Sequence, residues 1–349
     1  MKYISFLLAF VFIASVSEAR IWRINNKAGI NADFTTFYDA VNSSTVVNGD
    51  SLYFEPSTAD YATNSITVTK RLVMIGPGYF LDPANTSYPA NTGLQASTAD
   101  ARIGFFRLAA GAAGSKFIGL TLPGGVYFSA TSDIIFERVL FASYTAFEPG
   151  TSDHITFRKC YFFQTQIGNN PSAVITNFVF ENNILTNNSF LNLDKLSGTG
   201  NIYRNNSAYG GANGFQILNC YIANNIFGTY SESVFTNSTL KNNIFQMAQP
   251  LPGTATNNLI SQDMATVFVG GSSGSFDSRM ALKPGSPAIG AGLTVGSVVT
   301  PDCGAYGGPD PYRLSGIPNI PTIYTLTVPT SIPTGSATMN VSFSTRNNN

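Results

Sequence analysis

The chain has 349 residues, of which 44% are hydrophobic and 13% aromatic but only 11% charged. Its 19 basic and 19 acidic residues give a formal net charge of zero. The chain therefore has no net positive charge that would favour binding to nucleic acid or to an acidic membrane surface. A single histidine and three cysteines exclude a zinc finger and a disulfide-dense scaffold. The apolar fraction is too high for a disordered chain.

Residues 1–19 have the pattern of a secretory signal peptide. Lys2 precedes an apolar run over 4–16, and Ser17-Glu18-Ala19 matches the small-x-small site at which such peptides are cleaved. The run is shorter than the ~18 apolar residues of a membrane span. We therefore expect a secreted or cell-surface protein, cleaved near Ala19 and without a transmembrane segment.

The segments that follow predict a cap and a first coil. Asp33 as N-cap, with apolar residues at Phe34, Phe37, Tyr38 and Val41, predicts a short amphipathic helix. Such a helix would cover the open end of a stack of strands. Residues 49–56 and 66–76 have β-like patterns and would form the first coil.

The middle of the chain repeats a six-residue unit. The fourth residues of its copies are Val139, Cys160, Asn183, Asn206, Asn225, Asn243 and Asn258, which lie 21, 23, 23, 19, 18 and 15 positions apart. β-prone units at steps near 20, without helical periodicity, indicate a parallel β-helix with one coil per repeat. The fixed leucine frame of leucine-rich repeats is absent.

Each position of the unit forms a column along the stack, and its composition predicts where the side chains point. The first column is apolar and should face the core: Phe136, Phe157, Phe180, Tyr203, Ile222 and Leu240. The second should face outward, with charges of alternating sign over its first four members: Glu137, Arg158, Glu181, Arg204, Ala223 and Lys241. The third column contains Arg138 and Lys159, so its side chains are predicted to be solvated and to lie at a bend of the chain.

The asparagines of the fourth column predict an internal amide ladder. Coils of a parallel stack lie about 4.8 Å apart, which lets each side chain hydrogen-bond its neighbours. The fifth column is apolar and leaves two alternatives open: the chain bends so that it faces inward, or it forms an outer stripe covered by the C-terminal tail. Its members are Leu140, Tyr161, Ile184, Ile226, Ile244 and Leu259.

The C-terminal residues 309–349 differ in composition, with six of the 18 prolines and β-like runs at 323–328 and 338–344. Proline confines strands to edges, so this tail is predicted to be a small appendix on the main body. A cell-surface sorting domain is the alternative. Of Cys160, Cys220 and Cys303 at most one pair can form, and the favoured interpretation is three small buried residues.

These patterns resemble the secreted bacterial right-handed parallel β-helix proteins of the pectin-lyase-like superfold. The resemblance rests on GDSLYFEP and ITVTKRLVMIG near the start, the FENN-type coils, and SPAIGAG and DCGAYGG near the end. It implies a β-helix over residues 20–308 and a tail like that of an uncharacterised, non-catalytic-looking subgroup. A right-handed coil also follows from the general preference for right-handed parallel crossovers. The superfold hosts many functions, so function is not implied.

The catalytic motifs of enzymatic members are missing. The NTD, DD, GHG and RIK motifs of polygalacturonases and the DPHD motif of alginate epimerases do not occur. Between 177 and 260 the acids are Glu181, Asp194 and Glu232, too few for a calcium cage. We assign no catalytic, cofactor or metal site, and we expect a monomer with a structural, adhesive or glycan-binding role.

The alternative hypothesis is a polysaccharide lyase or glycoside hydrolase with a non-standard site. Its candidate residues are Glu137, Asp153, His154, Arg158 and Glu181. Arg158 between two glutamates favours a structural charge ladder, and Asp153-His154 favours a polar turn. If the protein binds glycans, the aromatic side chains predicted to stack on sugar rings are Tyr127, Phe128, Tyr144 and Phe147.

Overall fold

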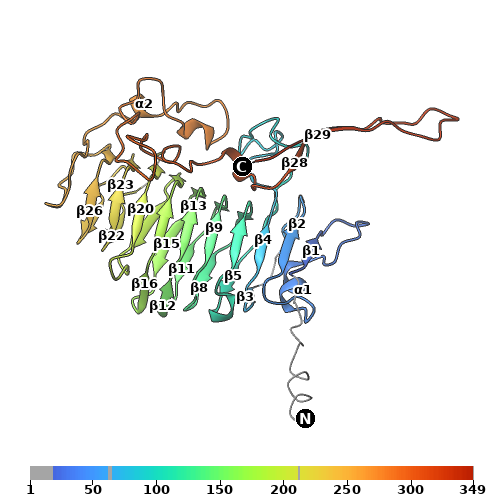
Figure 1. Cartoon of the computed structure of the whole chain (residues 1–349), viewed down its shortest axis with the longest axis horizontal. Coiled ribbons are helices and arrows are strands. Elements are labelled where there is room, and N and C mark those ends of the chain that lie inside the picture. The colour runs from blue at the N-terminus through green and yellow to red at the C-terminus, as the bar shows by residue number, and fades with distance from the viewer. Residues whose placement is uncertain (1–18, 62–64, 211–212, 349) are drawn as a thin grey trace, which may run out of the picture.

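Short parallel strands from successive coils stack into three sheets, as the repeat predicts (Figure 1). The computed structural model describes residues 19–61, 65–210 and 213–348, so the predicted signal peptide lies almost entirely outside the described residues. This architecture confirms an all-β parallel β-helix. Among the residues described, no helix is both long and apolar enough to traverse a membrane.

Each complete coil runs through the first, second and third sheet in turn. The first sheet contains, in spatial order, β1 (Ile21–Ile24), β2 (Ser51–Phe54), β4 (Val73–Ile75), β6 (Lys116–Ile118), β9 (Ile135–Glu137), β13 (Thr156–Arg158), β17 (Val179–Glu181), β20 (Ile202–Arg204), β23 (Tyr221–Ala223) and β26 (Thr239–Lys241). The second contains β7 (Thr121–Leu122), β10 (Leu140–Phe141), β14 (Tyr161–Phe163), β18 (Ile184–Thr186), β21 (Ser207–Ala208), β24 (Ile226–Phe227) and β27 (Ile244–Phe245). The third contains β3 (Ile66–Val68), β5 (Phe106–Leu108), β8 (Val126–Phe128), β11 (Thr145–Phe147), β15 (Gln166–Asn169), β19 (Phe190–Leu193), β22 (Gln216–Leu218) and β25 (Val234–Thr236).

The remaining elements are short. A parallel pair, β12 (Gly150–Asp153) and β16 (Ala173–Thr176), lies between the third and first sheets. The helices of the described residues are α1 (Phe37–Asn42), α2 (Met264–Val267) and three 3₁₀ turns at Ala110–Ala112, Ser278–Met280 and Leu314–Gly316. Near the C-terminus, β28 (Thr322–Thr327) pairs antiparallel with β29 (Ser342–Arg346). The two β-like runs predicted in the tail form these strands, although the second begins at Ser342 rather than at residue 338.

Helix α1 covers the N-terminal end of the stack, as predicted. Phe37 is fully buried, with its ring centroid 5.6 Å from that of Phe54. The predicted N-cap is wrong: Thr36 caps the helix by accepting a hydrogen bond from the backbone N–H of Asp39. Asp33 instead accepts one from the backbone N–H of Arg23 in β1, a strand that the sequence analysis missed.

The first column faces the core and stacks ring on ring. The ring centroids of Phe117 and Phe136 are 4.5 Å apart, and those of Phe136 and Phe157 are 5.3 Å apart. Farther along the stack, Phe180 and Tyr203 are parallel at 5.2 Å. Burying an aromatic side chain of this size contributes about 1.5–3 kcal/mol, so this column supplies much of the stabilisation of the solenoid.

The predicted asparagine ladder is confirmed. Asn183 donates to Asn206 Oδ1 at 3.1 Å, Asn206 to Asn225 Oδ1 at 3.0 Å, and Asn225 to Asn243 Oδ1 at 2.9 Å. The bond from Asn243 to Asn258 Oδ1 continues the series at 2.9 Å. Each amide also donates to a backbone oxygen of the adjacent coil, so buried polar atoms of the ladder are hydrogen-bonded on both sides.

The second sheet is apolar on both faces, which decides between the two alternatives for the fifth column. Its inner face carries Phe141 and Phe162, and its outer face carries the stripe of Leu140, Tyr161 and Ile184. The chain returns along this outer face after the last coil, and we call residues 263–317 the returning segment. Figure 1 shows it lying along one side of the stack. The segment that covers the outer face therefore begins at residue 263, well before residue 309, where the predicted tail starts.

The third column docks the returning segment, and the prediction that it is solvated is wrong. Its residues are at bends, with left-handed backbone angles that asparagine adopts more readily than most residues. Their side chains contact the returning segment or the chain end in five coils, in four of them through backbone atoms and in one through the carboxylate of Asp310. The contacts are Arg138 to the oxygens of Ile317 and Asn348, Lys159 to Asp310, Asn182 to the oxygens of Ala305 and Gly307, Asn224 to Leu293, and Asn242 to the oxygen of Ala291.

Asp277 organises the returning segment from within. Its carboxylate is fully buried and accepts hydrogen bonds from Asn91 Nδ2 at 3.0 Å, Tyr312 Oη at 3.2 Å and the Ser315 backbone N–H at 2.7 Å. These contacts join the returning segment to the long loop that follows β4. The buried charge is thereby compensated by several donors.

The three cysteines are free and buried, as the favoured interpretation expects. Cys160 lies in the core between β13 and β14, and burial raises the pKa of its thiol to about 12. Cys303 lies in the returning segment, where its thiol donates to the oxygen of Asn242 at 3.2 Å. Both are packing residues of low reactivity.

Asn183→Leu tests the ladder. The substitution removes the side-chain donor to Asn206 Oδ1 and leaves the Cys160 N–H without its acceptor, so the free energy of unfolding should fall by about 2 kcal/mol. Urea unfolding followed by circular dichroism measures the change. Asn31→Leu, at an exposed site outside the stack, is the control, and equal stability of the two variants would contradict the ladder.

Candidate functional site

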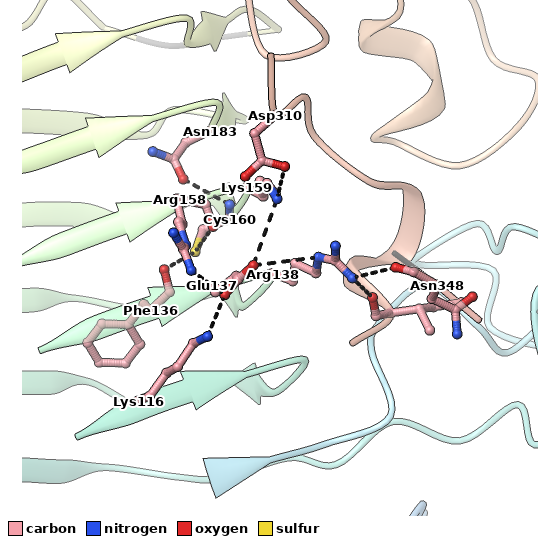
Figure 2. Close-up of polar contacts among 11 residues, drawn as sticks. Lys116, Phe136, Glu137, Arg138, Arg158, Lys159, Cys160, Asn183, Asp310 and Asn348 are labelled. Carbon is pink, nitrogen blue, oxygen red and sulfur yellow. Dashed lines mark hydrogen bonds and ion pairs between the residues drawn. The ribbon is translucent and has the colours of Figure 1, made fainter. Parts of the chain in front are cut away.

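The candidate residue Glu137 lies in the most densely charged cluster of the structure described, where the first sheet meets the returning segment (Figure 2). Its Oε2 is 2.9 Å from Lys116 Nζ and 2.8 Å from Arg158 Nη2. Lys159 Nζ lies 3.8 Å from Oε1 and also pairs with Asp310. Glu137 itself is almost completely buried.

This environment fixes the ionisation of Glu137. Burial alone would raise the pKa of its carboxyl, but hydrogen bonds from Lys116 and Arg158 and their charges outweigh burial and lower the pKa to about 2. A carboxylate held ionised cannot donate a proton at neutral pH. Arg138 Nε, 4.0 Å from Oε1, is a fourth cationic neighbour, and together these cations make Glu137 the electrostatic centre of the docking interface.

The alternating second column has the register that the repeat predicts. Arg158 pairs in register with Glu137 on one side and with Glu181 on the other, and Arg204 follows Glu181. Arg204 Nη2 donates to Glu181 Oε2 at 2.6 Å. Glu137 and Glu181 are thus separated by an arginine, which supports a charge ladder rather than a pair of catalytic carboxylates.

Asp153 and His154 lie at the bend between β12 and β13. His154 has a left-handed backbone conformation and is largely exposed, with Nδ1 2.7 Å from Asp153 Oδ2. The other oxygen of Asp153 accepts from Thr176 Oγ1 at 2.6 Å and Asn177 Nδ2 at 2.7 Å in the next coil. These bonds lower the pKa of Asp153 and give the pair the geometry of the predicted polar turn.

The outer face of the third sheet carries an aromatic patch, which we define as Phe105, Tyr127 and Tyr144. The ring centroids of Phe105 and Tyr127 are 4.9 Å apart, and those of Tyr127 and Tyr144 are 6.0 Å apart, both in edge-to-face geometry. Tyr144 is 40% exposed. The patch thus presents aromatic surface on a face that the returning segment does not cover.

Small residues make room for these rings. The register of β8 and β11 places Tyr127 beside Ala146, and that of β11 and β15 places Ala146 beside Gly168. A Cβ atom at Gly168 would lie only 2.4 Å from the Tyr144 hydroxyl, so the tyrosine extends across the strand at this glycine. Gly125 similarly leaves space beside Phe105, whose ring a Cβ would meet at 3.3 Å.

A charged pair borders the patch. Arg107 forms a bidentate pair with Glu148, with Nη2 2.6 Å from Oε1 and Nε 2.8 Å from Oε2. The Arg107 guanidinium lies 5.8 Å from the centroid of the Tyr127 ring. Hydrogen-bonding groups therefore flank the aromatic surface, the combination by which proteins orient polar ligands on an apolar platform.

The structure brings together only part of the predicted aromatic set. Tyr127 and Tyr144 lie on the outer face, whereas Phe128 and Phe147 are fully buried in the core with stacked rings 4.6 Å apart. Alternation along β8 and β11 could have separated the two pairs, because neighbouring residues of a strand point to opposite faces. Phe105, Arg107 and Glu148 were missed, since their adjacency depends on the register of distant coils.

Comparison with known proteins does not assign the chain to a group: no protein-family model matches it, and no curated protein matches it. Within the described residues, no group of three or more His, Cys, Asp or Glu side chains is arranged to hold a metal ion.

Glu137→Gln tests the charged cluster. The folded-state pKa of about 2 is below the ordinary value for glutamate, so the ionised carboxylate stabilises the fold above that ordinary value, and this stabilisation is lost as the pH falls through 2. We expect the free energy of unfolding to fall by about 3–5 kcal/mol at pH 7. The difference from wild type should shrink below about pH 4.

Urea unfolding of both proteins from pH 7 down to pH 2 measures this dependence. Glu148→Gln is the matched control, because its pair with Arg107 is partly exposed and such pairs contribute at most about 1 kcal/mol. If the free energy of unfolding of Glu137→Gln differs little from that of wild type at pH 7, or differs by the same amount at every pH, the charged cluster does not stabilise the docking of the returning segment.

Proposed function

We propose that this protein is secreted or displayed at the cell surface, where it binds glycans through the aromatic patch and has a structural or adhesive role. The signal-peptide pattern of residues 1–19 supports the location. The resemblance to secreted bacterial β-helix proteins of the pectin-lyase-like superfold supports the same location. The neutral, charge-poor composition suits an uncharged carbohydrate better than nucleic acid.

The observation that carries the proposal is the uncovered aromatic patch with its polar border. Tyrosine combines a broad apolar face with a hydroxyl group, which matches a sugar ring with its C–H faces and peripheral hydroxyls. The side chains of Gln166 and Asn192 lie on the same outer face, one and two strands beyond β11. The patch therefore continues as a polar surface along the stacking direction, suited to an extended chain of sugars.

The alternative of a polysaccharide-active enzyme receives less support from the geometry of its candidate residues. A general acid must carry a proton near its working pH, and Glu137 is held ionised by its cationic neighbours. Glu181 is paired with Arg204. The carboxylate of Asp153 is occupied by hydrogen bonds from Thr176 and Asn177.

Tyr144→Ala tests glycan binding. Removing the exposed ring should weaken binding to glycans selected on an array of plant and microbial polysaccharides by about two- to tenfold, the loss expected for one stacking contact of about 0.5–1.5 kcal/mol. Gly168→Ala should have a similar effect, because its Cβ displaces the Tyr144 side chain. Titration calorimetry on the selected glycan measures both.

Tyr38→Ala, at an exposed tyrosine on α1, is the control and should bind as wild type does. Melting temperatures of all three variants establish that they are folded. If wild type selects no glycan, or if Tyr144→Ala binds as tightly as Tyr38→Ala, the patch is not a glycan-binding site.

A further inference from the structure

A gap interrupts the outer face of the second sheet at Thr186. Phe163, Thr186 and Tyr209 occupy equivalent positions in three successive coils, because Phe163 lies beside Thr186 in register and the Tyr209 N–H donates to the oxygen of Leu185. The backbones that carry the two aromatic rings are therefore two strand spacings apart, roughly 9.6 Å. Threonine is too small to fill this interval, which leaves room for one planar ring between Phe163 and Tyr209.

The returning segment closes this gap into a cavity with a volume of about 330 Å³, at the lower end of the range for small-molecule sites. Phe276 and Arg279 line the cavity from the returning segment, and Tyr161 and Thr186 line it from the second sheet. The ring of Phe276 is parallel to that of Phe163, with centroids 5.5 Å apart. These packed rings make the cavity a preformed part of the fold.

The cavity has one unpaired positive charge. Arg279 is the one charged residue of the described lining, and it is not part of any ion pair among the described residues. Two of its N–H groups donate to the backbone oxygens of Ser272 and Ser273, which leaves three of its five N–H groups for a ligand or water. The carboxylate of Asp277, two residues earlier, does not line the cavity and has donors of its own.

A pair of hydroxyl groups in the lining has one hydrogen more than it can use. Tyr161 Oη and Thr186 Oγ1 are 2.8 Å apart, and either of them can donate to the other. Burial raises the pKa of Tyr161, so its hydroxyl keeps the proton. Each hydroxyl has one hydrogen to donate, and both side chains are buried. One O–H of the pair therefore lacks an acceptor among the described residues, although buried donors are almost always paired.

We propose that this cavity binds a small aromatic carboxylate, a molecule with one planar ring and one carboxylate group. A carboxylate supplies the negative charge that Arg279 lacks, and it only accepts hydrogen bonds. It can therefore bind both the guanidinium and the spare O–H of the Tyr161–Thr186 pair. The ring fills the gap between Phe163 and Tyr209. This site is separate from the aromatic patch and does not depend on the function proposed for it.

The probes are benzoate, benzyl alcohol and acetate. Benzyl alcohol keeps the ring and replaces the carboxylate with a neutral group, whereas acetate keeps the carboxylate and lacks the ring. Ligand-observed NMR titrations of the protein should show that benzoate binds at least about tenfold more tightly than either of the others. Benzyl alcohol loses the charge-assisted hydrogen bonds, and acetate loses the burial of the ring.

Arg279→Gln should lower the benzoate affinity by at least about tenfold and leave the benzyl alcohol affinity nearly unchanged. Arg313→Gln, at an exposed arginine of the same segment, is the matched control and should bind benzoate as wild type does. The double variant Tyr161→Phe, Thr186→Val removes both hydroxyls at once, so no unpaired partner is left to destabilise the fold. It should lower the benzoate affinity by about tenfold.

Melting temperatures establish that the variants are folded. The proposal is overturned if benzoate does not bind to wild type, if benzyl alcohol binds as tightly as benzoate, or if the folded Arg279→Gln and Arg313→Gln variants have equal benzoate affinity. If Arg279→Gln fails to fold, the double variant provides the test, and full benzoate affinity in that variant overturns the proposal.

Discussion

Most of the second sheet is apolar on both faces, and this constraint accounts for the course of the returning segment, residues 263–317. A sheet of this kind is stable only when both faces are buried, and one face of a solenoid sheet points away from the core. The returning segment covers that outer face together with Tyr79 and Phe80 of the long loop that follows β4. It is aligned coil by coil, because the third column presents a side chain at successive bends to its backbone, from Asn242 at Ala291 to Arg138 at Ile317.

The cover also determines which surfaces are left for binding. The outer face of the third sheet is not covered by the returning segment, and it carries the aromatic patch. The outer stripe of the second sheet becomes polar at Thr121, where a cavity of about 370 Å³ lies beside the long loop that follows β4. The charged cluster around Glu137 lies inside the docking interface, so its unusual electrostatics serve cohesion. A strongly shifted pKa in this protein therefore does not by itself indicate a catalytic group.

Much of the solenoid could be predicted from the sequence because neighbouring coils repeat the same unit. Phe136 and Phe157 share a column, and the amide ladder followed from the recurrence of Asn183 and its successors. The docking of the third column could not be predicted in this way. Arg138 was taken as solvated because charged residues are rarely buried, yet its partners Ile317 and Asn348 are far away in sequence. The same distance hid the cavity of about 370 Å³, whose lining comes from residues 57–60, 80–102, 121–123 and 140–142.

The most direct test of this account is hydrogen exchange of the returning segment in the double variant Asn182→Gly, Asn224→Gly. Glycine retains the left-handed bends at these positions and removes only the amides that bind the returning segment. The control is Asn188→Gly, at an exposed left-handed position. We predict faster exchange at 291–307 in the double variant, with protection retained in the strands of the first sheet. Unchanged exchange at 291–307 would contradict the claim that the third column holds the returning segment on the solenoid.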